Sequence, residues 1–134
     1  MFLCTGNSCR SQMAEGFAKF YLKKYIISSA GTNPEKINQS AIKVMEKIGI
    51  DMSSHYSKKI NNDELSKFDL IITLCGDAKD NCPIISDNKH IHWEIEDPAK
   101  YKEDKEGSIK KYSMIRDLII DKIKLLKNDL EKDN

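Results

Sequence analysis

Short apolar runs alternate along this chain with segments of helical periodicity, and this alternation constrains the fold more than any other feature. The strand-like runs are residues 1–3, 25–29, 69–74 and 90–93. Apolar side chains recur on one helical face in residues 11–23, 40–48 and 109–131. Strands that alternate with helices favour a parallel sheet with helices on both faces. We therefore expect one α/β domain over residues 1–134, with three α/β/α layers and a short central parallel sheet of about four strands.

The balance of charges argues against several classes of protein. Lysine and arginine together number 22, aspartate and glutamate 21, and the formal net charge is +1. This mixture gives no reason to expect a nucleic-acid partner. We find no apolar run of membrane-spanning length and no signal-peptide pattern before Cys4. We expect a cytoplasmic monomer, in which the four cysteines are reduced, catalytic or metal-bound rather than structural disulfides.

The segment from Cys4 to Ser11, CTGNSCRS, combines the features of an oxyanion site. It follows the first strand and leads into the first helix, whose N-terminal N–H groups attract anions. Gly6 and Asn7 tolerate unusual backbone angles, so the loop can turn its N–H groups inward. Arg10 adds a planar fork that can bind two oxygens of a tetrahedral anion. The predicted site therefore holds a phosphate-sized dianion.

Cys4 is the expected nucleophile of this site. The helix N-terminus and Arg10 both favour the thiolate, which is the reactive form of a cysteine. Ser11 is placed to donate a hydrogen bond to the sulfur when it becomes a leaving group. We interpret Cys9 as a packing residue. The expected anion-binding residues are Thr5, Gly6, Asn7, Ser8, Cys9, Arg10 and Ser11.

Residues 4–16, CTGNSCRSQMAEG, resemble the anion loop of low-molecular-weight protein tyrosine phosphatases, and more closely that of the arsenate reductases built on that fold. The similarity continues in SAG at residues 29–31, in TLCGDAKDNCP at residues 73–83, and in HW at residues 92–93 with EDPA at residues 96–99. The resemblance implies the fold of that family. It also implies that Cys4 is the nucleophile, Cys75 the second thiol and Cys82 the last one, which is passed to thioredoxin.

Two chemistries fit these motifs, and the first is phosphate ester hydrolysis through a phosphocysteine on Cys4. It needs a general acid, and by resemblance Asp97 protonates the leaving oxygen. The alternative for Asp97 is a simple turn residue before Pro98. Phosphatase relatives usually carry an aromatic residue after Asp-Pro, whereas this chain has Ala99. That departure weakens the phosphatase interpretation, which we keep as the alternative.

The second chemistry is reduction of arsenate to arsenite, which needs a source of electrons besides the loop. A second thiolate that attacks the sulfur of a Cys4–arsenate adduct would expel arsenite and leave a disulfide. A third thiol can then move this disulfide outward to a reductant. Cys75 and Cys82 fit these roles, whereas a phosphatase does not need them. We therefore predict a thioredoxin-dependent arsenate reductase that uses no cofactor.

The spacing of Cys75 and Cys82 also predicts a conformational change. Along a helix they would lie about 10 Å apart, whereas a disulfide needs Cα atoms within about 7 Å. We therefore expect residues 75–89 to rearrange when the Cys75–Cys82 disulfide forms.

Two further possibilities concern ligands. The cysteine spacings do not suit zinc and no histidine lies at ligand spacing, so we expect no metal. A pure binding module for phosphorylated or acidic ligands remains open, since it would keep the loop without needing Asp97 or three poised thiols.

Some reductases of the resembled family hold potassium, and Asn7, Glu15 and Ser29 match the positions of its ligands. Lys58 falls where an acidic residue would align, so its ammonium group can replace the ion and potassium dependence should be weak or absent.

Overall fold

The computed structural model describes residues 1–76, 89–100 and 105–132. Its strands form one four-stranded sheet in the order β2-β1-β3-β4, and all three neighbouring pairs are parallel. The strands are β1 (Phe2–Cys4), β2 (Ser29–Gly31), β3 (Leu70–Leu74) and β4 (Lys89–Trp93). The helices are α1 (Arg10–Tyr21), α2 (Gln39–Glu46), α3 (Asn62–Leu65), the 3-10 turn η1 (Pro98–Lys100) and α4 (Lys105–Lys132). This arrangement confirms the predicted α/β class and the parallel sheet.

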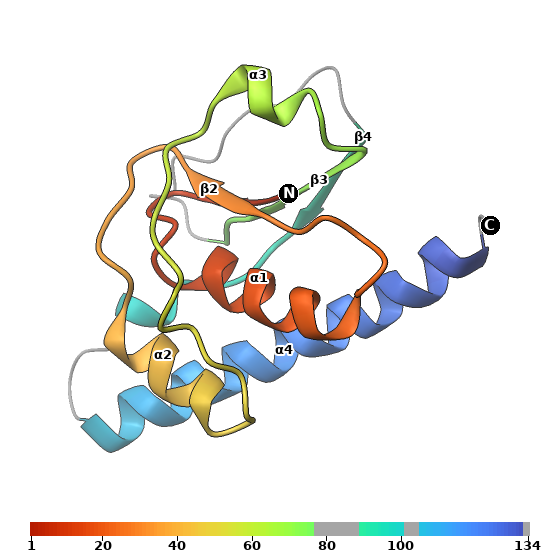
Figure 1. Cartoon of the computed structure of the whole chain (residues 1–134). Helices are drawn as coiled ribbons and strands as arrows, with labels where there is room; N and C mark the ends of the chain where they lie inside the picture. Colours follow the sequence, from red (N-terminus) through yellow and green to blue (C-terminus); the bar gives the residue numbers. More distant parts are fainter. Residues whose placement is uncertain (77–88, 101–104, 133–134) are drawn as a thin grey trace.

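Helices cover the two faces of the sheet unequally. α1, α2 and α4 lie together on one face, and the short α3 lies on the other (Figure 1). Alternate strand residues point to opposite faces of the sheet. Phe2 and Ile72 belong to the large core, between the sheet and α1. Leu3 and Ile71 belong to a smaller core on the other face, together with Leu65 of α3. Both faces of β1 and β3 are therefore buried, which explains why these strands read as continuous apolar runs.

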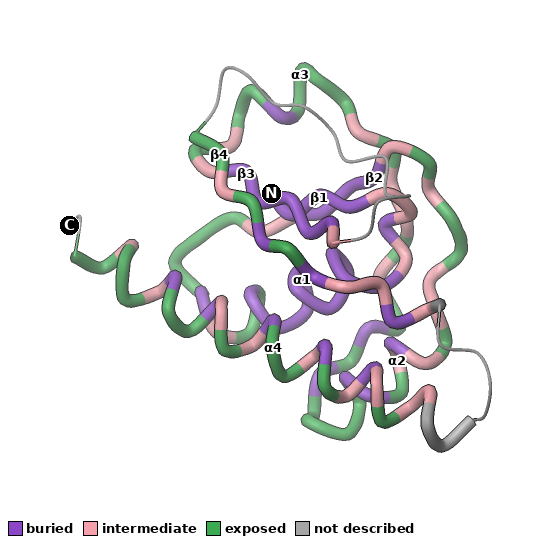
Figure 2. The backbone as a smooth tube through the Cα atoms, turned by 180° about the vertical axis from the view of Figure 1, so that it is seen from behind, coloured by how far each residue is buried: buried purple, intermediate pink, exposed green. Residues whose placement is uncertain are grey.

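α1 is the central helix of the molecule. Every residue from 10 to 18 is buried, because the sheet, α2 and α4 surround this part of the helix (Figure 2). The buried residues include the polar side chains of Arg10, Gln12 and Glu15. Buried polar groups need partners, and their partners define the site described below.

Three sequence-based boundaries were wrong. Residues 25–28 are not a strand, because β1 begins at Phe2 and pairs with β2 only from Ser29 onward, which leaves Ile26 86% exposed. The last helix starts at Lys105 rather than 109, and Leu118, expected on its apolar stripe, is 40% exposed. The sequence predicted no element between residues 48 and 69, but the short α3 lies there, capped by the Asn61 side chain.

The predicted rearrangement of residues 75–89 and the position of Cys82 lie outside the described residues, apart from Cys75, Gly76 and Lys89. Within the described ranges, no helix has both the length and the apolar character needed to cross a membrane.

Candidate active site

The loop between β1 and α1 is shaped by the segment that follows β2. Backbone N–H groups of that segment donate to three loop carbonyls: Asn33 to Thr5 (2.9 Å), Glu35 to Gly6 (2.8 Å) and Asn38 to Ser8 (2.9 Å). The carbonyls are therefore turned toward residues 33–38. This leaves the loop N–H groups for the inner side of the turn, as an anion nest requires.

Asn7 makes the sharp bend of the loop. Its φ of 47° is the only positive value at a non-glycine residue within the described chain. The prediction of unusual backbone angles was right for Asn7 but not for Gly6, whose φ lies outside the left-handed region. Gly31 lies directly behind the bend, where a Cβ atom would come within 2.5 Å of the Thr5 carbonyl oxygen. β2 can therefore approach the loop only because residue 31 is a glycine.

Hydrogen bonds lead from Asn7 to Cys4, the predicted nucleophile. The Asn7 Nδ2 group donates to Ser11 Oγ at 2.8 Å, and Ser11 Oγ lies 2.9 Å from Cys4 Sγ. Because the Ser11 oxygen already accepts a hydrogen bond from Asn7, its own proton can point to the sulfur. Cys4 is 2% exposed. The predicted contact between Ser11 Oγ and the Cys4 sulfur is therefore present at hydrogen-bond distance.

Arg10 lies at the opposite side of the loop. Its Nη1 donates to the Ile95 carbonyl oxygen at 2.8 Å, and its Nη2 lies 3.9 Å from Asp97 Oδ2. Arg10 is buried, whereas the Asp97 side chain is 35% exposed. Asp97 Oδ1 also accepts a hydrogen bond from Ala99 N–H at 3.0 Å. Asp97 is thus both the turn residue before Pro98 and an acid held beside the anion loop.

The cysteines differ in their environments. Cys4 and Cys9 are free thiols, and Cys75, directly after β3, is buried and disulfide-bonded. Burial raises the pKa of the Cys9 thiol well above its usual value, with further contributions from Asp97 and Cys4. Cys9 belongs to the large hydrophobic core, which supports its interpretation as a packing residue. Cys82 lies outside the described residues.

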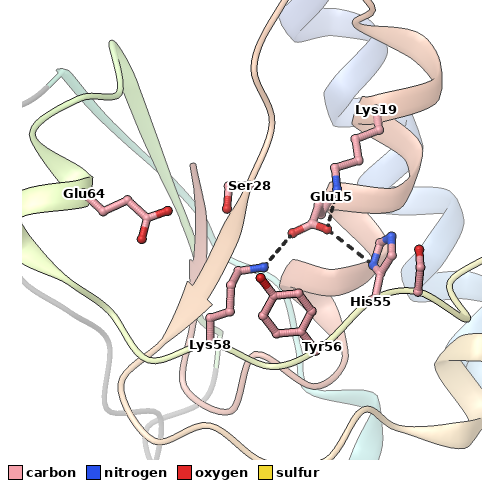
Figure 3. A pocket seen from close by; sticks show the side chains of 8 residues that line it. Glu15, Lys19, Ser28, His55, Tyr56, Lys58 and Glu64 are labelled. Atoms are coloured by element: carbon pink, nitrogen blue, oxygen red, sulfur yellow. Dashed lines mark hydrogen bonds and ion pairs between the residues drawn. The ribbon is translucent and has the colours of Figure 1, made fainter.

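A buried carboxylate, Glu15, anchors a second polar cluster behind the loop (Figure 3). One of its oxygens lies 3.0 Å from Lys19 Nζ and 3.5 Å from His55 Nδ1. The other accepts a hydrogen bond from Ser29 Oγ at 2.7 Å and lies 3.5 Å from Lys58 Nζ. Burial raises the pKa of Glu15, but the Ser29 hydrogen bond and the surrounding cations outweigh it, so its pKa is lowered. The carboxylate is thus ionised and fully surrounded by donors.

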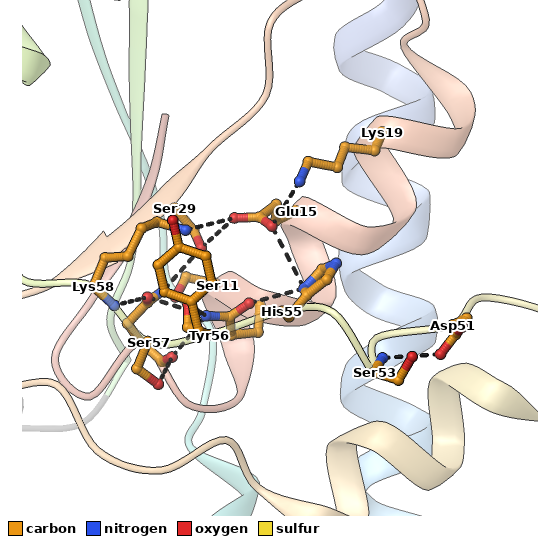
Figure 4. A network of polar contacts seen from close by, with 12 residues as sticks. Ser11, Glu15, Lys19, Ser29, Asp51, Ser53, His55, Tyr56, Ser57 and Lys58 are labelled. Carbon is orange, nitrogen blue, oxygen red and sulfur yellow. Dashed lines mark hydrogen bonds and ion pairs between the residues drawn. The ribbon is translucent and has the colours of Figure 1, made fainter.

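This cluster is connected to the anion loop (Figure 4). Ser29 accepts a hydrogen bond from the Asn7 amide at 2.8 Å, and the Lys58 backbone N–H donates to Asn7 Oδ1 at 2.9 Å. His55 Nδ1 bonds Gln12 Oε1 at 2.9 Å, and Gln12 Nε2 in turn donates to the carbonyl oxygen of Asn7. The Glu15 cluster therefore holds the bend of the loop from behind.

Comparison with known proteins assigns the chain to a family. Residues 1–134 match the low molecular weight phosphotyrosine protein phosphatase family. The chain belongs to this family. The resemblance stated from the sequence is thereby confirmed, together with the fold that it implied.

Within this family, the chain is similar to proteins named for arsenate reduction. A curated arsenate reductase of Oceanobacillus iheyensis is 46% identical over 92% of this chain and 91% of its own length. A solved structure of an arsenate reductase in the phosphate-binding state is 32% identical, with a TM-score of 0.77 over 94% of this chain and 93% of that one. The thioredoxin-dependent arsenate reductase of Corynebacterium glutamicum is 25% identical, with a TM-score of 0.75 over 99% of this chain and 61% of that one.

The structure brings most of the sequence-predicted site together. Cys4 ends β1 and Arg10 and Ser11 begin α1, so the three residues meet at the two ends of the loop as expected, and Asp97 faces it from beyond β4. Sequence reasoning missed Gln12 and His55, which are 43 positions apart and meet only in the fold. Among the described residues, no group of three or more histidine, cysteine or acidic side chains could hold a metal ion.

Proposed function

We propose that this protein reduces arsenate to arsenite, with thioredoxin as the reductant. The observation that carries the proposal is a free, buried Cys4 at the start of an anion loop together with a disulfide-bonded Cys75 directly after the adjacent strand. β1 and β3 are parallel neighbours, and each cysteine stands at the carboxyl end of its strand. The similarity to named arsenate reductases supports the same substrate for this chain.

The proposed first step joins arsenate to the enzyme. The anion binds the loop N–H groups and Arg10, and the Cys4 thiolate attacks arsenic. A sulfur–arsenic(V) bond forms, and one arsenic–oxygen bond breaks as the oxygen leaves as water, with Asp97 placed to supply a proton. Ser11 stabilises the Cys4 sulfur as nucleophile and later as leaving group.

The proposed second stage moves two electrons from thiols to arsenic. The Cys75 thiolate attacks the Cys4 sulfur, the sulfur–arsenic bond breaks with its electron pair going to arsenic, and arsenite leaves. The resulting Cys4–Cys75 disulfide is attacked by Cys82, which frees the Cys4 thiolate and leaves a Cys75–Cys82 disulfide. Thioredoxin then reduces this disulfide, and the cycle restarts.

The test is arsenate-dependent NADPH oxidation with thioredoxin and thioredoxin reductase present. Cys4→Ser should abolish turnover, because no thiolate remains to attack arsenate. Cys75→Ser and Cys82→Ser should abolish multiple turnovers, whereas Cys9→Ser, the matched control, should retain them. Full multiple-turnover activity of Cys82→Ser with thioredoxin alone would overturn the relay.

A residual phosphatase activity is the second candidate function. Asp97 beside Arg10 and an intact anion loop are the parts that hydrolysis through a phosphocysteine requires. Ala99 replaces the aromatic residue expected after Asp-Pro, so we expect slow cleavage of small aryl phosphates. A colorimetric assay with p-nitrophenyl phosphate measures this activity directly, and Cys4→Ser should remove it.

We also propose that the protein acts as a cytoplasmic monomer. The relay needs reduced thiols between turnovers, which a reducing compartment supplies. Sedimentation velocity at assay concentrations should give the mass of one 15.4 kDa chain. A dimer that persists on dilution would contradict the proposed monomer.

A further inference from the structure

Gly76 follows the disulfide-bonded Cys75 and lies against the segment that binds Arg10. A Cβ atom on Gly76 would come within 2.5 Å of both the carbonyl carbon and the oxygen of Ile95, and within 2.8 Å of the Glu96 nitrogen. All three atoms belong to one peptide group. Real Cβ atoms do not approach backbone this closely, so any side chain at residue 76 would force the backbone to move.

The same peptide group is the one that Arg10 binds. The Ile95 carbonyl oxygen accepts the 2.8 Å hydrogen bond from Arg10 Nη1. Two residues farther along, Asp97 lies 3.9 Å from Arg10 Nη2. Gly76 therefore touches one side of a peptide whose oxygen orients the guanidinium of the anion loop.

We propose that Gly76 is a positioning residue for anion binding: its missing side chain lets the Ile95–Glu96 peptide lie where it aims Arg10 into the loop. This role deepens the proposed function, since it concerns the anion site which that function uses. It also connects the residue next to the disulfide-bonded Cys75 to the cation that recognises the substrate.

A side chain at residue 76 would displace the Ile95–Glu96 peptide more readily than β3. β3 is paired with both β1 and β4, and Cys75 directly follows it. Residues 95 and 96 lie beyond the end of the edge strand β4, which stops at Trp93. The Ile95 side chain is fully buried in the core, so the softest response is rotation of the peptide plane, which carries the carbonyl oxygen away from Arg10.

The test measures binding of inorganic phosphate by isothermal titration calorimetry to the protein with the Cys75 disulfide intact, the state that the structure shows, and it does not depend on arsenate turnover. Gly76→Ala should weaken phosphate binding about tenfold, because a displacement of about 1 Å is enough to spoil a two-pronged anion contact. Gly16→Ala is the matched control: the nearest atoms that its Cβ would meet are side-chain atoms of Ile50, Met45 and His55, at 3.2, 3.5 and 3.6 Å, instead of backbone. This variant should keep the phosphate affinity of the parent protein.

A double-mutant cycle separates positioning from a general structural effect. Arg10→Lys should weaken phosphate binding, and Gly76→Ala should add nothing in that background, since the group it positions is gone. Independent effects that add in the double variant would overturn the proposal. So would an unchanged phosphate affinity of a folded Gly76→Ala protein.

If Gly76→Ala does not fold, NMR spectra of the parent protein test the same role of Gly76. Saturation with phosphate should shift the backbone amide signals of Gly76 and Glu96, and Arg10→Lys should abolish both shifts. Signals that stay in place at phosphate saturation would overturn the proposal. Because every readout uses phosphate, these results stand apart from whether arsenate is the substrate.

Discussion

The two sides of the anion loop are held in different ways. On one side, the buried Asn7 side chain has each of its polar atoms bonded to other groups of the protein, most of them buried. Its amide nitrogen donates to two hydroxyls and its oxygen accepts two N–H groups, which belong to Ser11, Ser29, Gln12 and Lys58. A saturated and buried network of this kind fixes one geometry, because any rearrangement would leave a buried polar atom without a partner.

The Arg10 side instead combines a buried cation with a partly exposed acid. Arg10 binds a backbone oxygen of residue 95, and Asp97 reaches it only at 3.9 Å. Asp97 has access to solvent protons, which a general acid needs. We infer a division of labour: the Asn7 side sets the shape of the loop, and the Arg10 side holds the groups that the proposed chemistry uses. Changes on the first should cost stability and affinity together, and changes on the second should alter rate or affinity alone.

The largest effect should come from the acid. Asp97→Asn removes the proton donor while keeping the shape of the side chain, so cleavage of p-nitrophenyl phosphate should slow by roughly 10²–10⁴-fold. Its phosphate affinity and its free energy of unfolding should stay close to those of the parent. The neighbouring Glu96→Gln is the control, since Glu96 pairs with Lys111 at 3.0 Å instead of Arg10. An unchanged rate of Asp97→Asn would remove Asp97 from the mechanism.

The next largest effect should come from Asn7. Asn7→Gly keeps a residue that tolerates the positive φ but loses the side-chain bonds, and each buried partner left unsatisfied costs about 1–3 kcal/mol. We expect urea denaturation to show a loss of about 2–4 kcal/mol in the free energy of unfolding, with weaker phosphate binding.

Asn7→Ala is the matched variant. It loses the same bonds and also places an alanine in the left-handed region, which costs about 1 kcal/mol more. Equal stability of the glycine and alanine variants would show that the backbone conformation of Asn7 contributes nothing. Either variant with normal stability but weak phosphate binding would break the distinction between the two sides of the loop.

A smaller effect should appear on acidification, through His55. Burial lowers the pKa of His55 below its usual 6.5, although Glu15 opposes this. The unfolded chain then binds the proton more readily, so the free energy of unfolding should fall as the pH drops below 6.5. The pKa of Glu15 is also lowered, from 4.5, and its contribution to stability should be lost as the pH falls below that value.

His55→Gln separates these two contributions. The variant should lose the pH dependence that begins near 6.5 and keep the one that begins near 4.5. Urea denaturation across this pH range, with the parent protein as the control, gives the comparison. A variant with the same pH profile as the parent would mean that His55 does not couple the cluster to pH.

The sequence predicts the site where its signals are local. Cys4, Ser11 and Arg10 lie within eight residues, so a strand followed by a loop and a helix suffices to place them. Cys75 is predictable as well, because parallel strands end at one edge of a sheet. The contact of Arg10 with Ile95 spans 85 positions and depends on where the chain turns after β4. No periodicity or motif reports such a contact.

The boundaries of some helices and strands were predicted wrongly for related reasons. The length of β2 depends on that of its partner β1. The apolar residues before Ser29 have the sequence pattern of a strand, but β1 has no residues with which they could pair. α3 spans four residues, too few for a helical period, and its capping Asn61 is a weak signal alone. The Gln12–His55 pair could have been suspected only from a buried polar residue on α1 that needs a partner.

The smallest expected effect concerns potassium and the Asn7 side of the loop. The sequence placed Lys58 where a cation site would otherwise have an acidic ligand, and in the structure its Nζ lies 3.5 Å from Glu15 Oε1. The Lys58 ammonium also lies over the Tyr56 ring, 4.7 Å from its centroid, which holds it in place. A tethered cation already neutralises Glu15, so a free ion gains little there. Replacing sodium by potassium at equal ionic strength should therefore change the KM for arsenate and the phosphate affinity by less than about twofold.

The Lys58→Gln variant tests this reasoning. It removes the tethered charge and should weaken phosphate binding, and potassium should restore part of the lost affinity. Lys36→Gln is the control. Lys36 is exposed, and its replacement removes the same charge without changing a contact of Glu15. Several-fold activation of the parent protein by potassium over sodium would show that Lys58 does not take the place of the ion.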